Sequence, residues 1–245
     1  MLYHELSDEQ SDYSYVVDSS AFAEQLDLFS RLQNGIGLRP ELTFDDGHRS
    51  NYEVALPLLC ARDMKAHFFI TAGWTGVRSG YMGWNELRAL HDAGQRIGAH
   101  GWSHALLTHC DVAKLHTELS SARSLLQDKL GIDVTSMSFP GGRFNRRVLA
   151  ACWEAGFTQL YSSIPRSETL PLGSLAGRLN IRRNMSLAWI ANLLDSDGRV
   201  LRRLGLQDRL KTASKAVLGD GIYASLWALL NRRPPEIDGV EDTAE

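Results

Sequence analysis

Short apolar runs alternate with amphipathic segments along this chain, from its start to about residue 185. The alternation is typical of an α/β fold with mainly parallel strands, because each strand needs a returning helix before the next one. The expected strands span residues 1–4, 41–44, 64–71, 96–99, 134–139, 157–162 and 179–182, and the expected helices span residues 20–33, 51–62, 84–93, 111–130 and 145–155. About seven strand–helix units of this kind fit a (β/α) barrel, and an open doubly wound sheet has the same local pattern.

Two groups of polar residues directly follow expected strands. Asp45 and Asp46 end one strand, and His100 and His104 follow another. Neighbouring carboxylates repel each other, and a metal ion removes that repulsion. Two imidazoles and one carboxylate leave positions open on the ion, as in catalytic metal sites. The pattern therefore predicts a divalent metal, with Zn²⁺ fitting best and Co, Ni, Mn or Fe as alternatives.

Only one aspartate of the pair is needed as a ligand. The other, held beside a water on the ion, can act as general base, which indicates hydrolysis of an amide or ester without a covalent enzyme intermediate. A later strand runs into Pro140-Gly141-Gly142. Glycine lets backbone N–H groups approach a substrate oxygen closely, so this segment is a candidate oxyanion site. A plain turn is the alternative interpretation.

The composition excludes several classes of protein. A chain of 245 residues with 44% apolar and 22% charged residues can form one α/β barrel or two small domains. Its net charge of −3 argues against a general nucleic-acid binder. The three cysteines are far apart, as expected for reduced thiols. Neither a secretory signal nor an apolar run of membrane-spanning length is recognisable, so we expect a cytoplasmic protein.

Together these motifs resemble those of the polysaccharide deacetylases, carbohydrate esterase family 4. Thr-Phe-Asp-Asp-Gly at residues 43–47 matches the first family motif, and His-Gly-Trp-Ser-His at residues 100–104 matches the second in its two histidines. Phe-Pro-Gly-Gly-Arg at residues 139–143 stands at the third. The resemblance covers roughly residues 1–183. It implies a distorted (β/α) barrel that removes acetyl groups from N-acetylated sugars.

The resemblance also implies a role for each motif residue. It makes Asp45 the general base, and it makes Asp46, His100 and His104 the metal ligands. Contacts with the substrate and its oxyanion are then expected from the turn at the third motif, which comprises Pro140, Gly141, Gly142 and Arg143.

Two departures from the family pattern concern the catalytic aspartate. Ser138 stands where the family has the arginine that braces this aspartate, and Arg143 is the candidate substitute. No histidine follows His116, so the usual C-terminal acid histidine is absent.

The start of the chain offers a replacement for this acid. Leu2-Tyr3-His4 resembles the opening strand of exopolysaccharide-type deacetylases, in which the motif order is permuted and this histidine acts as the acid. Because a closed barrel brings its first and last strands together, we expect His4 at the site. His48, which follows the aspartate turn, is the competing candidate.

Strand signals stop at about residue 186. We expect a catalytic barrel in residues 1–185 and a helical extension with a polar tail in residues 186–245. Residues 199–233 contain eight Lys or Arg and two Asp. This segment either packs on the barrel with a solvated basic face or contacts an anionic surface, namely a membrane or a polyanionic glycan.

Three hypotheses for the function remain open. The leading one is a metal-dependent deacetylase of an N-acetylhexosamine-containing glycan in cell-surface or exopolysaccharide biosynthesis. Its substrate would be a lipid-linked or nucleotide-linked sugar or a nascent exopolysaccharide, which places the enzyme in the cytoplasm, with membrane-surface contact through residues 199–233. The alternatives are a C–N hydrolase of a small non-sugar amide and a catalytically silent glycan-binding protein.

Overall fold

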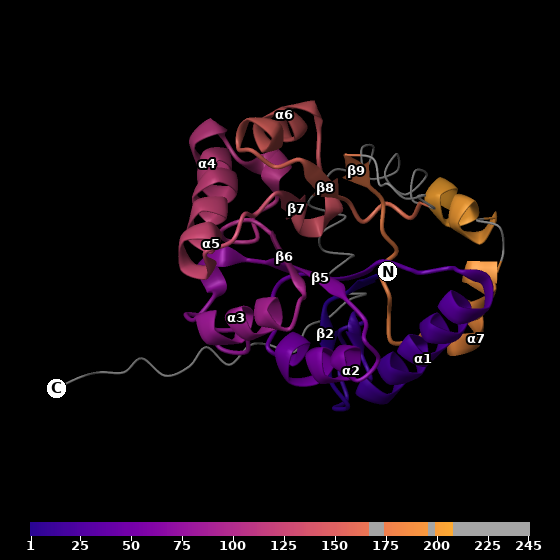
Figure 1. The fold of residues 1–245 in the computed structure, drawn as a ribbon. Helices are drawn as coiled ribbons and strands as arrows, with labels where there is room; N and C mark the ends of the chain where they lie inside the picture. Colours follow the sequence, from indigo (N-terminus) through magenta and orange to yellow (C-terminus); the bar gives the residue numbers. More distant parts are fainter. Residues whose placement is uncertain (167–173, 196–198, 208–245) are drawn as a thin grey trace.

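Seven parallel strands form the central sheet of the computed structural model, which describes residues 1–166, 174–195 and 199–207. The strands, in hydrogen-bonded order, are β1 (Leu2–Tyr3), β4 (Leu42–Phe44), β5 (Ala66–Ile70), β6 (Arg96–Ala99), β7 (Ser136–Ser138), β8 (Gln159–Tyr161) and β9 (Leu175–Ala176). Figure 1 shows them at the centre of the molecule, with helices around them. All pairings in this sheet are parallel, so the carboxyl ends of the strands lie at one edge.

The first strand closes the sheet into a distorted barrel. On one side Leu2 pairs with Thr43 of β4, and on the other it forms a parallel bridge with Asn180. The amide of Leu2 donates to the carbonyl of Leu179 at 2.8 Å, and the amide of Ile181 donates to the carbonyl of Leu2 at 2.8 Å. The start of the chain therefore lies beside the segment that follows β9. This closure confirms the (β/α) barrel and argues against the open sheet.

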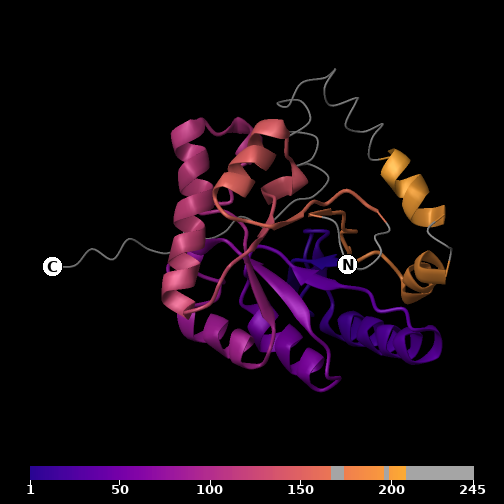
Figure 2. The same ribbon diagram turned by 45° about the horizontal axis from the view of Figure 1, so that its top comes forward.

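Helices cover the outside of the strands, as Figure 2 shows. They are α1 (Ser19–Ile36), α2 (Leu56–Cys60), α3 (Trp84–Asp92), α4 (Val112–His116), α5 (Ala122–Leu130), α6 (Arg146–Glu154) and α7 (Leu187–Asp195). In α1, Phe22, Leu26 and Phe29 recur at helical spacing and are buried. Gly37, with φ of 71°, ends this helix because glycine adopts the left-handed conformation without strain.

The barrel has an apolar outside and a largely polar inside. Tyr3, Phe44 and Phe68 belong to the large core shared with the helices. Because neighbouring strand residues point to opposite faces, the residues that flank these point inward. Phe69 and Tyr161 form a small inner apolar cluster with Ala176. The other inward positions include the buried polar residues Thr43, Asp45, His67, Ser136, Ser138 and Arg178. The interior thus places charge directly beneath the carboxyl ends of the strands.

Three short elements differ from the sequence prediction. The expected strand at residues 179–182 forms only the single bridge at Asn180, while β9 lies just before it. A separate two-stranded parallel sheet, β2 (Glu5–Leu6) with β3 (Val16–Val17), was not predicted. Each of these strands has two residues, which is too short to show an alternating pattern.

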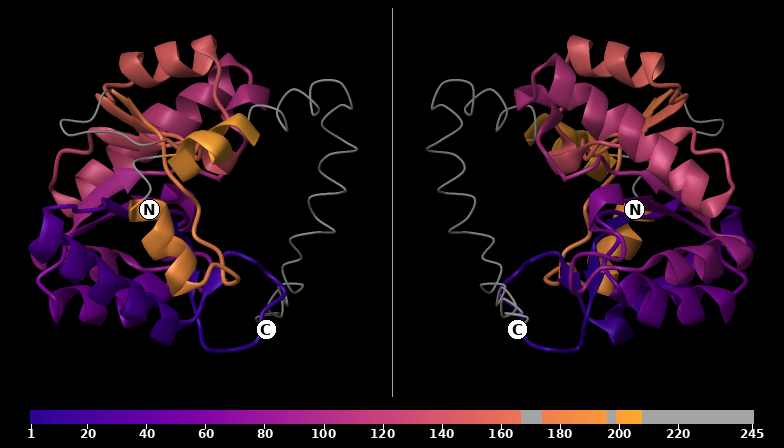
Figure 3. Two further views of the ribbon diagram at one scale, coloured as in Figure 1. Left: turned by 90° about the vertical axis from the view of Figure 1, so that its right-hand side faces the viewer. Right: turned by 90° about the vertical axis from the view of Figure 1, so that its left-hand side faces the viewer.

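The C-terminal part of the described chain is helical, as predicted. In Figures 1 and 3, α7 lies beside α1, and its Trp189, Ile190 and Leu193 join the outer core. Residues 199–207 form a further helix. The rest of the expected basic segment and the polar tail lie outside the described residues. Among the described residues, no helix has both the length and the hydropathy that a membrane crossing requires.

Candidate metal centre and active site

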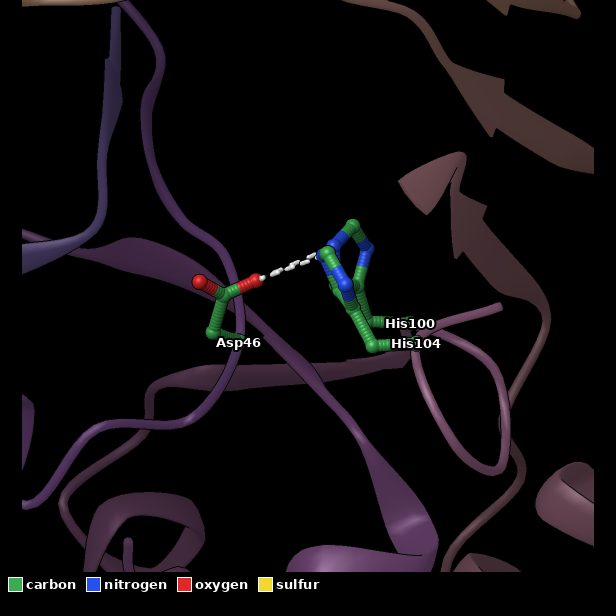
Figure 4. Close-up of side chains that lie close together, drawn as sticks. All are labelled: Asp46, His100 and His104. Atoms are coloured by element: carbon green, nitrogen blue, oxygen red, sulfur yellow. Dashed lines mark ion pairs between the residues drawn. The ribbon is translucent and has the colours of Figure 1, made fainter. Parts of the chain in front are cut away.

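Asp46, His100 and His104 meet at the carboxyl end of the barrel. Asp46 follows β4 and His100 follows β6, the two strands on either side of β5. Asp46 Oδ1 lies 3.2 Å from His100 Nε2 and 3.3 Å from His104 Nε2, as Figure 4 shows. One ligand atom from each of the three residues lies within 4.8 Å of the other two. The fold therefore brings the predicted ligand set together.

The backbone at this centre is held in an uncommon conformation. Asp46 has φ of 72° and His104 has φ of 60°, and both lie in the left-handed region. Such residues cost about 1–3 kcal/mol each and persist where the surrounding structure holds them, often at functional sites. Gly101, with φ of 82°, lies in the loop between the histidines, and a Cβ there would lie 2.9 Å from Glu118 Oε2. The loop therefore requires glycine at this position.

The donor atoms of the three residues fit a divalent cation. His100 Nδ1 lies 2.9 Å from the carbonyl oxygen of Ser138, to which only a protonated nitrogen can donate. A neutral His100 then presents the lone pair of Nε2 to Asp46 Oδ1, and two facing lone pairs require a proton or a cation between them. Two imidazole nitrogens and a carboxylate oxygen are a ligand set of catalytic zinc sites.

Electrostatics favour the charged form of Asp46. Burial alone would raise the pKa of its carboxyl group, but the imidazoles of His100 and His104 hold that pKa well below its usual range. Burial also disfavours a charged His100, yet the carboxylates of Asp45 and Asp46 outweigh this effect and raise the pKa of His100. The centre thus attracts positive charge.

Asp45 has a different partner, Arg178. Arg178 Nη1 donates to Asp45 Oδ1 and Nη2 donates to Oδ2, each at 2.8 Å. Both side chains are 3% exposed, and Arg178 Nε also donates to the carbonyl of Ser162 at 3.1 Å. Paired donors on two carboxylate oxygens fix the orientation of the carboxylate. The brace on Asp45 therefore comes from Arg178, which sequence reasoning missed, instead of the predicted Arg143.

Ser138 completes this arrangement. Its hydroxyl donates to Asp45 Oδ2 at 2.8 Å and accepts from Arg178 Nη2 at 2.6 Å. Thr43 Oγ1 accepts from Arg178 Nη1 at 3.1 Å. Burial raises the pKa of Asp45, but the guanidinium of Arg178 more than offsets it, and the pKa is lowered overall. The Asp45 carboxylate is therefore ionised at neutral pH.

His4 lies beside these residues, directly after β1. It interacts electrostatically with Asp46, Asp45 and His100. Burial lowers the pKa of His4 below its ordinary 6.5, although the two carboxylates oppose the shift. Its Nδ1 is buried and has no hydrogen-bond partner within the part of the chain that the structure describes. A buried, unsatisfied polar atom is typical of a site that binds a ligand or water.

His48 makes contacts with other residues. Its Nδ1 lies 2.9 Å from the hydroxyl of Ser50, and its Nε2 lies 3.9 Å from Glu5 Oε1. Its ring packs edge-on against Tyr81, with ring centroids 5.8 Å apart. For His4, in contrast, the electrostatic interaction with both aspartates is established.

The third motif forms a turn beside the loop that carries His100 and His104. Pro140–Gly142 is a short 3₁₀ turn, and Gly141 has φ of 63°. The amide of Gly142 donates to the carbonyl of Phe139 at 2.8 Å, so this amide is used within the turn. A Cβ on Gly101 would lie 3.7 Å from the Pro140 ring, which places the turn next to the loop that carries the histidines.

Glu118 holds the histidine loop from below, although sequence reasoning did not single it out. It lies in the π-helical turn Thr117–Ser121 and is 0% exposed. Its Oε2 accepts from the amides of Trp102 and Ser103 at 2.8 and 2.9 Å, and its Oε1 lies 2.9 Å from Lys114 Nζ. Two loop amides thus depend on one buried carboxylate.

We expect Glu118→Ala to weaken metal binding about 10- to 100-fold, a range typical of residues that orient metal ligands. Without the carboxylate, the loop amides lose their acceptor and His104 is no longer held at its strained φ. Competition with a fluorescent zinc chelator measures the affinity. Lys114→Ala, which leaves the amide contacts in place, is the matched control. Equal affinities of Glu118→Ala and the unmodified chain would show that the loop holds itself.

The fold and these side chains define a class of protein: a (β/α) barrel with a candidate divalent-metal centre and a second buried aspartate at the carboxyl ends of its strands. The family model for polysaccharide deacetylase matches residues 40–160, which include Asp45, Asp46, both histidines and the Pro140 turn. The chain belongs to this family.

Known proteins agree with this assignment. A chitin deacetylase of Pestalotiopsis sp is 29% identical over 124 residues, which cover 50% of this chain and 41% of that protein. The Streptococcus pyogenes deacetylase PplD, solved in complex with acetate, has a TM-score of 0.67 at 19% identity and covers 79% of this chain and 96% of its own. A polysaccharide deacetylase from Bacillus cereus has a TM-score of 0.69 at 17% identity. The match covers 79% of this chain and 67% of that protein. These two structures share the fold. The chain spans about half the length of the curated relatives it matches.

Proposed function

We propose that this protein is a metal-dependent hydrolase that removes N-acetyl groups from an N-acetylhexosamine-containing glycan or glycan precursor. One observation carries the proposal: the two neighbouring aspartates have different partners. Asp46 faces His100 and His104, whereas Asp45 is paired with Arg178. One carboxylate is thus available as a ligand and the other as a base. Membership of the polysaccharide deacetylase family supports an acetylated carbohydrate as substrate.

In this proposal, Asp45 accepts the proton of the attacking water. Its ion pair with Arg178 keeps the carboxylate charged and fixes its direction. Asp46, His100 and His104 would hold the divalent ion, which supplies Lewis acidity toward the acetyl carbonyl and toward water when it is bound. Zn²⁺ suits the ligand set best, with Co, Ni, Mn and Fe as alternatives.

The backbone of the third motif limits which amides can donate to an oxyanion. Pro140 has no N–H group, and the amide of Gly142 donates to Phe139. The amide of Gly141 is therefore the proposed backbone donor from these three residues to the developing oxyanion, and Arg143 remains a proposed substrate contact. His4 would give a proton to the leaving amine, because it lies beside Asp45 and Asp46.

A chelation experiment tests the metal-dependent activity. The purified chain is expected to bind one divalent ion and to release acetate from chitooligosaccharides. Dipicolinate should reduce the release to background, and added Zn²⁺ or Co²⁺ should restore it. A panel of simple acetylated amides is assayed in parallel. Preference for the simple amides would favour a small-amide hydrolase, and glycan binding without metal or turnover would favour a silent glycan-binding protein.

Substitution of each histidine tests the general acid. His4→Gln is expected to lower kcat about 10²- to 10⁴-fold, the usual contribution of a general acid, and His48→Gln to leave it within about twofold. An acid must be protonated to act, and burial lowers the pKa of His4 below 6.5. The rate should therefore be greatest below this pKa and decline as pH rises through it, and His4→Gln should lose this decline. The reverse pattern of losses would assign the acid role to His48.

The cellular setting follows from the substrate. We infer that residues 1–185 act as the catalytic unit in the cytoplasm on a lipid-linked or nucleotide-linked sugar or a nascent exopolysaccharide. Arg199, Arg202 and Arg203 are exposed on the helix at residues 199–207, and Leu206 is 59% exposed. A basic helix with an exposed apolar residue suits contact with an anionic membrane surface. Residues 186–245 would then serve as the peripheral membrane extension.

A further inference from the structure

The segment that supplies Arg178 continues toward the mouth of the barrel. Its side chains alternate: Arg178 reaches Asp45 inside the barrel, while Leu179 and Ile181 belong to the outer core. Asn180 pairs with Leu2, so both occupy the same level of the barrel wall. Beyond this bridge the segment leaves β1, because the amide of Arg183 donates to the carbonyl of Ser14 at 3.0 Å. Arg182 therefore lies beside the loop that carries Tyr15.

Side-chain contacts agree with this placement. Arg182 Nη2 donates to the hydroxyl of Tyr15 at 3.2 Å, and its Cζ lies 5.1 Å from the centroid of the Tyr15 ring. The same ring packs against His4, with centroids 5.1 Å apart. Tyr15 is 8% exposed, so the ring that neighbours both the imidazole and the guanidinium is buried. The positive charge of Arg182 is thus one ring away from His4.

Among the described residues, Arg182 lacks the carboxylate partner that the nearby Arg178 and Arg183 each have. Arg178 pairs with Asp45, and Arg183 pairs with Asp18. Within the described ranges, no carboxylate pairs with Arg182, and the one hydrogen bond of its guanidinium goes to the neutral hydroxyl of Tyr15, whose ring it also faces. Arg182 is half-buried. A guanidinium with one neutral acceptor keeps most of its five N–H donors for another group.

Partly buried, preorganised guanidinium groups bind planar carboxylates and phosphates in paired hydrogen bonds. We propose that Arg182 determines substrate specificity by binding an anionic group, a carboxylate or a phosphate, next to the acetamido group that is hydrolysed. This inference rests on the proposed function for the location of the acetamido group. The substrate class then narrows from N-acetylated glycans in general to acidic or phosphorylated ones.

Binding experiments on the zinc-loaded full chain test the inference without turnover. Calorimetry compares N-acetylglucosamine 1-phosphate with N-acetylglucosamine, and a hyaluronan tetrasaccharide with chitotetraose. The unmodified chain should bind at least one anionic ligand about 10- to 100-fold more tightly than its neutral counterpart, the range for hydrogen bonds to a charged group. If the chain prefers the anionic ligand only in the first pair, the group that it binds is a phosphate. If it does so only in the second pair, the group is a carboxylate. No preference in either pair overturns the proposal.

Variants separate recognition from structure. Arg182→Ala should abolish the preference for the anionic ligand and leave neutral binding within about twofold, whereas Arg182→Lys should retain part of it. Tyr15→Phe removes the hydroxyl but keeps the guanidinium, so it should keep the preference. Arg31→Ala removes an exposed charge on α1 and is the control for net charge. An equal loss in Tyr15→Phe and Arg182→Ala would show that Arg182 acts only by packing, which overturns the proposal.

Acetate release by the same variants distinguishes this inference from the proposed function. With anionic substrates, Arg182→Ala should raise KM and leave kcat nearly unchanged, because the contact is made equally in the ground and transition states. If no substrate releases acetate while the charge preference in binding persists, the proposed function fails and Arg182 remains an anion-binding residue. If acetate is released but Arg182→Ala binds anionic and neutral ligands with the same affinities as the unmodified chain, only the specificity proposal fails.

Discussion

Asp45→Asn is expected to slow acetate release about 10²- to 10⁴-fold while the chain still binds one divalent ion. The substitution removes the proton acceptor but preserves the shape of the side chain. Asp46, His100 and His104, the proposed ligands, face one another, as Figure 4 shows, whereas the carboxylate of Asp45 is paired with Arg178. Acetate release and metal content are measured on the same preparation.

The main difficulty of this experiment is stability. An asparagine cannot neutralise the buried Arg178, and breaking a buried ion pair costs roughly 3–5 kcal/mol. Activity is therefore compared at a temperature at which circular dichroism shows the variant to be folded. Asp27→Asn, which breaks the exposed pair with Arg62, is the matched control and should keep full activity. Full activity in Asp45→Asn would remove Asp45 from the role of base.

The meeting of the candidate metal ligands could be predicted from the sequence because each strand-to-loop transition carries its own local signal. Asp45 and Asp46 end one apolar run, and His100 and His104 follow another. Parallel strands place such transitions at one edge of the sheet, so local patterns are sufficient to predict that the side chains meet. The same alternation predicted a parallel α/β fold but left a barrel and an open sheet as alternatives. The family resemblance implied the barrel, and the pairing of Leu2 with Asn180 confirmed its closure.

Arg178 and Glu118 could not be predicted in the same way. The ion pair of Arg178 with Asp45 joins residues 133 positions apart, and neither β9 nor the bridge at Asn180 is long enough to show a strand pattern. One signal was available: an arginine between small and apolar residues, in Ala176-Gly177-Arg178-Leu179, needs a buried anionic partner. Glu118 looks like any helical glutamate in the sequence, and only the tertiary structure places it under the histidine loop.

Arg178→Ala is expected to lower the free energy of unfolding by about 3–5 kcal/mol at pH 7, because it leaves the Asp45 carboxylate charged and unpaired in the barrel interior. Only the hydroxyl of Ser138 would still donate to that carboxylate among the contacts described above. Urea unfolding, followed by circular dichroism, measures the change. Activity should also fall, since the base is no longer held in one direction.

The pH dependence of this loss identifies its cause. In the unmodified chain Arg178 lowers the pKa of Asp45, so the stability from the pair is fully present above the ordinary pKa of 3.8 and is lost as pH falls through the lowered pKa. Without Arg178, burial acts against the charge and raises the pKa of Asp45. The variant then takes up a proton as pH falls, so its deficit should be smaller at about pH 5 than at pH 7.

Removing both charges of the ion pair should differ from removing one. Asp45→Leu combined with Arg178→Met leaves no buried charge, and apolar replacements of buried ion pairs are often neutral or stabilising. We expect it to be inactive, yet more stable at pH 7 than Arg178→Ala. A deficit of Arg178→Ala that is the same at both pH values would mean that Arg178 stabilises the barrel by packing against Phe69 and Tyr161. The ion pair would then serve the chemistry of Asp45 more than the stability of the fold.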